Sequence, residues 1–149
     1  MSEKLEKTGG CQCGQVRYRA RLDPDQAYLC HCRMCQRATG GVAAAFINLE
    51  IADLEWESGP DWYASSPIAK RPFCSNCGTP LGFCFNEGEN IDITVGSLDD
   101  PYGIEPHWHF ASETIHEAWI DMSKLPRKPI KEYEALNQKW IDATGSVPE

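Results

Sequence analysis

Short runs of alternating or mainly apolar residues recur along the chain and are separated by polar turns. Residues 16–22 alternate apolar positions with Arg17, Arg19 and Arg21, which is the two-residue period of a strand with one solvent-facing side. A solvated strand face explains these arginines better than an anion site, because no phosphate-binding loop accompanies them. Many short strands with little helix predict a mainly β, antiparallel domain. The predicted strands are residues 16–22, 27–29, 42–49, 51–57, 81–85 and 91–95, with a further short alternating stretch at 107–110.

Helical patterns are fewer and shorter. Cys35 to Thr39 is long enough for one helical turn, which Gly40 and Gly41 would end. Apolar residues recur at helical spacing over residues 130–140 and predict a single amphipathic helix there. We therefore expect one domain over residues 1–149, with a core at about 8–125, a helical tail at 126–149, and fraying of the last five residues.

The composition is that of an ordinary globular protein, with 42% hydrophobic and 24% charged residues. No apolar run approaches the ~20 residues that a membrane helix needs, and the polar start of the chain lacks the apolar segment of a signal peptide. These features predict a cytoplasmic protein without a membrane partner. The net charge of -8 gives no general attraction to nucleic acid.

Eight cysteines are the chain's most distinctive chemistry, and seven of them fall into three closely spaced groups. In a reducing compartment such groups indicate metal ligands more often than structural disulfides. Redox pairs, disulfides and plain core thiols remain alternatives to metal binding. Cys84 lies between Phe83 and Phe85, where a buried core thiol is favoured over a ligand.

Two close pairs can complete a tetrahedral zinc site, since zinc binds four thiolates without a strong geometric demand of its own. Cys11 with Cys13 and Cys74 with Cys77 are such pairs. The metal would fix a long loop whose closure is otherwise entropically unfavourable. Gly78 stands directly after Cys77, where a tight metal-binding turn favours a residue that tolerates positive φ. We therefore predict a structural zinc at these four thiols.

The middle group has three thiols, Cys30, Cys32 and Cys35, with no fourth thiol nearby in the sequence. Three protein ligands and an open position are typical of catalytic zinc, because water or a substrate atom takes the fourth place. Two alternatives stay open. Cys84 or a histidine could close the site, or Cys32 and Cys35 could form a redox dithiol, although the expected βαβ context is missing.

Other polar residues near these groups are weaker candidates. His31 is flanked by two ligand candidates and should point away from them along an extended segment, where it could donate a hydrogen bond or move a proton. His107 and His109 could share one side of a strand, although structural or surface roles are commoner. The basic residues that could meet a substrate carboxylate are Arg37, Lys70 and Arg71.

Three cysteine motifs occur in order and carry a resemblance. They are Gly10-Cys11-Gln12-Cys13-Gly14, Cys30-His31-Cys32-x-x-Cys35 and Phe73-Cys74-x-x-Cys77-Gly78. Together they resemble the glutathione-dependent formaldehyde-activating enzyme family, also called the centromere-protein-V-like family. The resemblance covers about residues 8–125, including Gly96 to Pro101, the His107 region and Trp119, and the tail after Pro126 carries less of it.

The resemblance implies an antiparallel β-tent fold stabilised by zinc. It also implies a structural zinc at Cys11, Cys13, Cys74 and Cys77, and a catalytic zinc at Cys30, Cys32 and Cys35. The family's named activity is a carbon–sulfur lyase reaction that joins glutathione and formaldehyde to S-hydroxymethylglutathione. In the corresponding hypothesis the middle zinc orients the glutathione thiolate, and His31 or water handles the alkoxide proton. Two alternatives are a zinc-stabilised binding module without catalysis and a lyase acting on a different thiol adduct.

Overall fold

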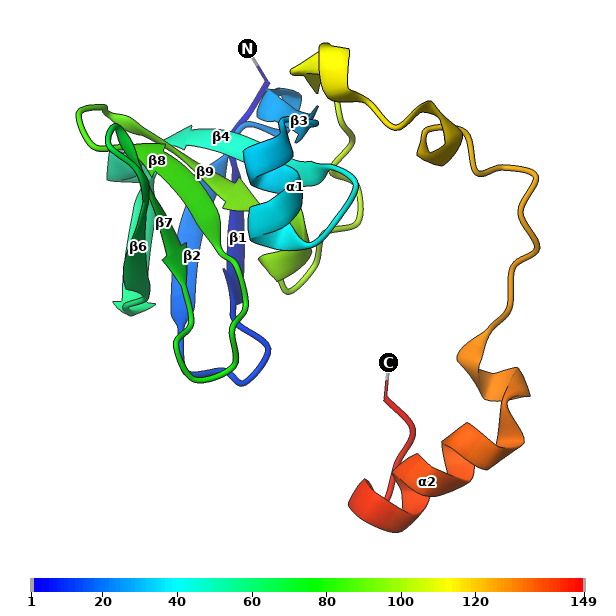
Figure 1. Ribbon diagram of the computed structural model, residues 1–149. Coiled ribbons are helices and arrows are strands. Elements are labelled where there is room, and N and C mark those ends of the chain that lie inside the picture. The colour runs from blue at the N-terminus through cyan, green and yellow to red at the C-terminus, as the bar shows by residue number, and fades with distance from the viewer. Residues whose placement is uncertain (1, 149) are drawn as a thin grey trace. The chain divides into compact units, whose positions relative to one another are not determined.

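The computed structural model describes residues 2–148, which form two compact units. The first unit ends at His116 and contains all the strands, and the second begins at Glu117 (Figure 1). Two sheets make up most of the first unit, so the predicted mainly β class is confirmed.

The smaller sheet has three antiparallel strands in the order β1-β2-β5. They are β1 (Leu5–Gly10), β2 (Arg17–Leu22) and β5 (Leu54–Ser58). β1 was not predicted, because its polar residues lack an alternating apolar face. It forms by pairing with β2 over its full length, from Leu5 opposite Leu22 to Gly10 opposite Arg17.

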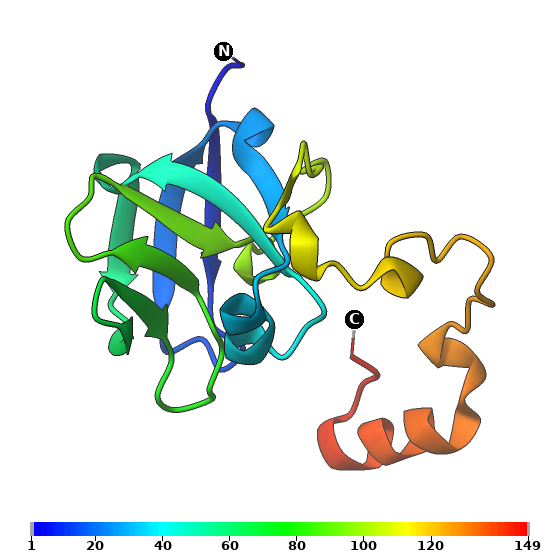
Figure 2. The ribbon, with the colours of Figure 1, turned by 45° about the horizontal axis from the view of Figure 1, so that its top comes forward.

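The larger sheet has seven strands in the order β10-β3-β4-β9-β8-β7-β6. Figure 2 shows β4, β9 and β8 side by side at its centre. Every neighbouring pair is antiparallel except β10 with β3, which is parallel. The strands are β3 (Ala27–Cys30), β4 (Ala44–Glu50), β6 (Asp61–Ser66), β7 (Ala69–Phe73), β8 (Gly82–Phe85), β9 (Asn90–Thr94) and β10 (His109–Phe110).

Alternation along β4 sends its side chains to two different apolar clusters. Ile47 and Leu49 join the main core, which also takes Tyr18 and Leu22 from the smaller sheet. Phe46 faces the other way and belongs to a second cluster with two cysteines. Full burial of a side chain such as Ile47 contributes about 1.5–3 kcal/mol, so the main core fixes how the two sheets pack. The second cluster lies on the opposite face of the larger sheet.

One short helix, α1 (Arg33–Thr39), follows β3. It begins two residues earlier than predicted because the Cys32 side chain caps it by accepting from the backbone N–H of Cys35. It ends at Gly40, whose φ of 76° is left-handed, as the glycine pair predicted. The position of α1 places two cysteines at the start of a rigid element.

Two predicted elements are wrong in part. The strand predicted over residues 51–57 starts only at Leu54, because residues 51–53 form a 3-10 turn that leaves Ile51 44% exposed. The single helix predicted over residues 130–140 is interrupted at Tyr133, whose ψ of 79° is not helical. The α-helix there is α2 (Glu134–Thr144). The 3-10 helices are Pro24–Gln26, Ile51–Asp53, Val95–Ser97, Ser112–Thr114, Glu117–Trp119 and Ile130–Glu132.

Neither α1 nor α2 is long enough to span a membrane. Among residues 2–148, no helix combines the length and the apolar character needed to cross a bilayer.

Candidate metal centres and the cavity beside them

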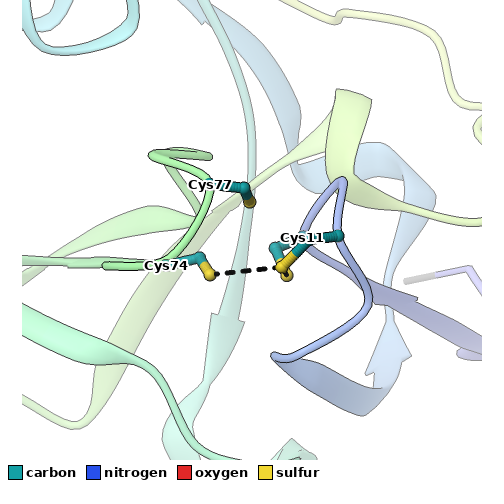
Figure 3. A group of neighbouring side chains, drawn as sticks. Cys11, Cys74 and Cys77 are labelled. Carbon is teal, nitrogen blue, oxygen red and sulfur yellow. Dashed lines mark hydrogen bonds between the residues drawn. The ribbon is translucent and has the colours of Figure 1, made fainter.

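Four thiols from distant parts of the sequence meet between two loops. Cys11 and Cys13 lie in the turn between β1 and β2, and Cys74 and Cys77 lie in the turn between β7 and β8. Their sulfur atoms all lie within 4.8 Å of one another, and Figure 3 shows Cys11, Cys74 and Cys77 pointing toward a common centre. Four soft donors converging in this way match the requirements of a closed tetrahedral zinc site. This group could hold a metal ion.

Both loops turn back at a glycine. Gly14 and Gly78 have positive φ values of 82° and 81°, and each donates its N–H back to the carbonyl of Cys11 or Cys74. The prediction that Gly78 takes positive φ is confirmed. The turn after Cys77 also places a hydrogen-bond donor beside its sulfur atom. The Thr79 hydroxyl lowers the pKa of Cys77 to about 5, which favours the thiolate form that a metal needs.

The middle thiols also converge. Cys30 ends β3, Cys32 caps α1 and Cys35 lies in the first turn of α1, and the three sulfur atoms lie within 4.8 Å of one another. Cys30 and Cys35 are buried, and Cys32 is partly exposed. This group could also hold a metal ion, and among residues 2–148 no further cysteine, histidine or carboxylate belongs to it.

A buried arginine contacts the middle group. Arg71, on β7, is only 8% exposed, and its Nη2 donates to the Sγ of Cys35 at 3.4 Å. The Cys30 thiol, followed by the Arg71 guanidinium, lowers the pKa of Cys35 to about 5. The same arrangement raises the pKa of Cys30, since one of two adjacent thiols must keep the proton. Without a metal, the group therefore favours one thiolate held next to a fixed cation.

A cavity of about 430 Å³ opens directly onto the three thiols. Its walls carry aromatic rings on the outer face of the larger sheet, including Tyr28, Phe46 and Phe83, together with Phe110 from β10. Arg71 also lines it and lies with its guanidinium carbon 4.9 Å from the centre of the Phe83 ring. The arrangement places a small-molecule volume beside a thiol group that is one donor short of a closed site.

Comparison with known proteins assigns the chain to a family. Residues 6–114 match the family model described as glutathione-dependent formaldehyde-activating enzyme. The chain belongs to this family. The match spans both thiol groups, and the motifs that carried the resemblance lie within it.

Two known proteins are similar to this member of the glutathione-dependent formaldehyde-activating enzyme family. A Schizosaccharomyces pombe protein named as an uncharacterized lyase is 32% identical over 85 residues, which are 57% of this chain and 62% of that protein. The chain thus matches somewhat less than two thirds of that relative's length. The crystal structure of a Rhodobacter sphaeroides protein aligns with a TM-score of 0.55 at 25% identity, covering 68% of this chain and 98% of that one.

His31 does not join the middle thiols. Its side chain is buried, and its Nε2 lies 2.8 Å from the Nδ1 of His109. Its carbonyl accepts hydrogen bonds from the Gln36 amide at 2.8 Å and from the Thr114 hydroxyl at 2.6 Å. These contacts tie the segment between Cys30 and Cys32 to the end of the first unit. His31 therefore has a positioning environment, and its role in proton transfer stays a prediction.

The two histidines that could share a strand face do not both lie in a strand. His109 lies in β10, whereas His107 lies before the strand and its Nε2 is 3.6 Å from the Oδ1 of Asp25. The backbone N–H of His107 donates to the carbonyl of Ala27 at 2.8 Å, just before the two-residue β10 ladder.

The three basic residues predicted near a substrate do not form one patch at the cavity. Lys70 lies over the Trp62 ring, 4.6 Å from its centre. Arg37 lines a second cavity of about 700 Å³, which shares Met34 and Arg71 with the first. Alternation along β7 explains why Arg71 lines the cavity and Lys70 does not, because neighbouring residues of a strand point to opposite faces.

Cys84 belongs to the main hydrophobic core and to neither thiol group. It pairs across from Lys70 on the face away from the cavity, and burial raises the pKa of its thiol. The core role favoured from the sequence is thus confirmed. Cys84 does not complete the middle site.

Sequence reasoning missed a polar chain behind the cavity. The Tyr28 hydroxyl and the Asn48 amide both hydrogen-bond to the carboxylate of Asp92, and Asn90 donates to Asn48 at 2.7 Å. Asp92 is only 8% exposed, although its alternation with isoleucines was typical of a solvent-facing position. Burial raises its pKa. Asp92 is buried because its strand is covered on both faces, and no local sequence pattern reveals such coverage.

Proposed function

We propose that this chain is a zinc-dependent carbon–sulfur lyase of the type that joins glutathione with formaldehyde. Family membership and a relative named as a lyase support the reaction class. The single observation that carries the proposal is the difference between the two thiol groups. Four thiols supply all the donors of a tetrahedral ion, whereas three thiols leave one position open and line a cavity.

The donor sets fit zinc in both places. Thiolates are soft ligands that zinc accepts in fours for structural sites and in threes where a position stays open. We assign the structural ion to Cys11, Cys13, Cys74 and Cys77, and the functional ion to Cys30, Cys32 and Cys35. When bound at the middle group, zinc supplies a Lewis acid that favours the thiolate form of a substrate thiol.

The chain's own residues would balance the charge of the thiolates and position the substrate. Arg71 offsets the negative charge of the thiolates and holds Cys35 in place. The cavity walls hold the carbonyl carbon beside the thiol group and exclude bulk water. The alkoxide that forms needs a proton. His31 does not line the cavity, since its ring lies against His109, and this placement favours water over His31 as the proton source.

Exchange NMR with glutathione and carbon-13 formaldehyde tests the proposal. We expect the zinc-loaded protein to accelerate exchange between free and thiol-bound formaldehyde, and Cys32→Ser to abolish the acceleration. Cys84→Ser is the matched control, since Cys84 lies in neither thiol group. No acceleration at any zinc loading would remove the proposal.

A second candidate is a zinc-stabilised binding module without catalysis. The three-thiol group would then serve as a second structural site. Two tightly held zinc ions that glutathione does not perturb, together with no acceleration of exchange, would favour this candidate.

A further inference from the structure

The cavity beside the middle thiols is lined mainly by apolar side chains, and Ser66 and Arg71 are its main polar residues besides the thiols and the Tyr28 hydroxyl. The Tyr28 hydroxyl hydrogen-bonds to Asp92, and one N–H of the Arg71 guanidinium donates to Cys35, with the guanidinium carbon 4.9 Å from the centre of the Phe83 ring. The Ser66 hydroxyl accepts from the backbone N–H of Ile68 at 3.3 Å. The rest of the wall is aromatic or aliphatic, apart from the thiols themselves. An ionised or amide-rich group would lose most of its hydrogen bonds to water there, because the lining can replace few of them.

The cavity is also too large for a one-carbon group. Its volume of about 430 Å³ falls in the range of sites that bind whole small molecules, about 300–1,000 Å³. Formaldehyde has two heavy atoms, and a single water molecule takes a share of only about 30 Å³ in the liquid. A hydroxymethyl group on a substrate sulfur would leave most of this volume unfilled.

The aromatic wall is held in place from behind. The Tyr28 ring lies 6.0 Å from that of Phe46 and 6.3 Å from that of Phe110, the latter at 80°. Trp108 stacks on Tyr28 at 5.0 Å with nearly parallel planes. Rings fixed at these separations suit a further flat or bulky apolar group, because edge-to-face and offset contacts are the preferred aromatic arrangements.

We propose that the carbonyl substrate is an aromatic or similarly bulky apolar aldehyde, whose side group fills this cavity. The inference rests on the proposed lyase function and names its substrate class. In the joining direction the thiol sulfur attacks the carbonyl carbon, the carbon–sulfur bond forms, and the carbonyl oxygen takes the proton that the thiol gives up. The reverse reaction returns aldehyde and thiol, with no net oxidation.

The charged ends of the thiol carrier lie outside this apolar cavity. The second cavity adjoins it at Met34 and Arg71 and contains Arg37 and Ser65, so it offers the polar surface that the first lacks. The apolar group of the aldehyde therefore lies beside the thiols, and the polar groups of the thiol carrier lie toward the second cavity.

Binding of unreactive thioethers tests the inference without turnover. Calorimetry on the zinc-loaded protein would compare S-benzylglutathione with S-methylglutathione. We expect the benzyl compound to bind at least about 10-fold more tightly, since one apolar methylene alone gives about 10-fold in a fitted pocket. Equal or weaker binding of the benzyl compound overturns the inference, and so does failure of both to bind.

A substitution at the cavity rim gives the matched comparison. Ile68 lines the cavity and is 65% exposed, so Ile68→Asp adds a charge where folding tolerates it. The benzyl-to-methyl preference should fall at least about 5-fold, because the new carboxylate faces an apolar wall. Ile51→Asp is the control, as Ile51 is also exposed but lies in the 3-10 turn before β5. An unchanged preference in Ile68→Asp overturns the inference.

Turnover separates this inference from the proposed function. Exchange NMR would compare glutathione with formaldehyde and glutathione with phenylacetaldehyde at equal enzyme. Faster catalysed exchange of the phenylacetaldehyde adduct supports the inference. Turnover of the formaldehyde adduct alone overturns it and leaves the lyase function intact, whereas turnover of neither adduct overturns both.

Discussion

The guanidinium of Arg71 donates to the sulfur of Cys35 at 3.4 Å inside the second apolar cluster. A zinc ion with three thiolates would carry a net negative charge, and a buried site of that kind needs a nearby cation. Arg71 is placed to supply it, with its guanidinium carbon 4.9 Å from the centre of the Phe83 ring.

Replacing Arg71 should weaken metal binding at the middle group. We expect Arg71→Met to lower zinc affinity there by about 10–100-fold, the range typical for residues that support metal ligands. Chelator competition would measure it. Lys70→Met is the control because it removes a neighbouring positive charge from the opposite face of β7. Equal affinities in the two variants would contradict the role given to Arg71.

Loss of a thiol from each group should have a different effect on the stability of the fold. Cys74→Ser should remove one zinc ion and lower the melting temperature by about 10 °C or more, because it disconnects two loops that are sixty residues apart in sequence. Cys32→Ser should also remove one zinc ion while leaving the fold in place. Metal analysis and thermal melting of both variants check this. A Cys32→Ser protein less stable than Cys74→Ser would reverse the assignment.

Asp92 should make stability depend on pH. Its pKa is raised above the usual 3.8 by burial, so the folded state holds the proton more tightly than the unfolded chain. Stability from this group is present at pH values below 3.8 and is lost as pH rises through the raised pKa. Relative to wild type, Asp92→Asn should therefore gain stability as pH increases from about 4. Urea unfolding of both proteins across this range measures the difference, and parallel curves would contradict it.

Gly82 should resist substitution. A Cβ added there would lie 2.2 Å from the carbonyl oxygen of Asp92, which the backbone of β9 fixes. We expect Gly82→Ala to destabilise the protein by about 1–3 kcal/mol and to disturb Phe83 at the cavity. Gly96→Ala is the control, because nothing lies within 4 Å of its added Cβ. Denaturant unfolding compares them, and equal stabilities would argue against close packing of β8 on β9.

The sequence was sufficient for the parts of the fold that local pattern determines. β2, β8 and β9 follow directly from alternation, and the cysteine spacing identified both thiol groups. β1 forms by pairing with β2, and β6 forms by a hairpin with β7, and the residue pattern of neither strand indicates this pairing. The burial of Asp92 and the contact of Arg71 with Cys35 depend on which face of the larger sheet is covered. Which face becomes covered is determined only when segments distant in the sequence pack together.

The two thiol groups lie with different apolar clusters, and the strands of the larger sheet separate those clusters. Cys11 and Cys74 belong to the main core, whereas Cys30 and Cys35 belong to the second cluster. An oxidant that reaches the folded protein can therefore join thiols within a group but not between groups. A disulfide formed at the cavity should then remain reversible by mild reduction, since the cross-links that would trap a misfolded chain cannot form while the sheet is intact.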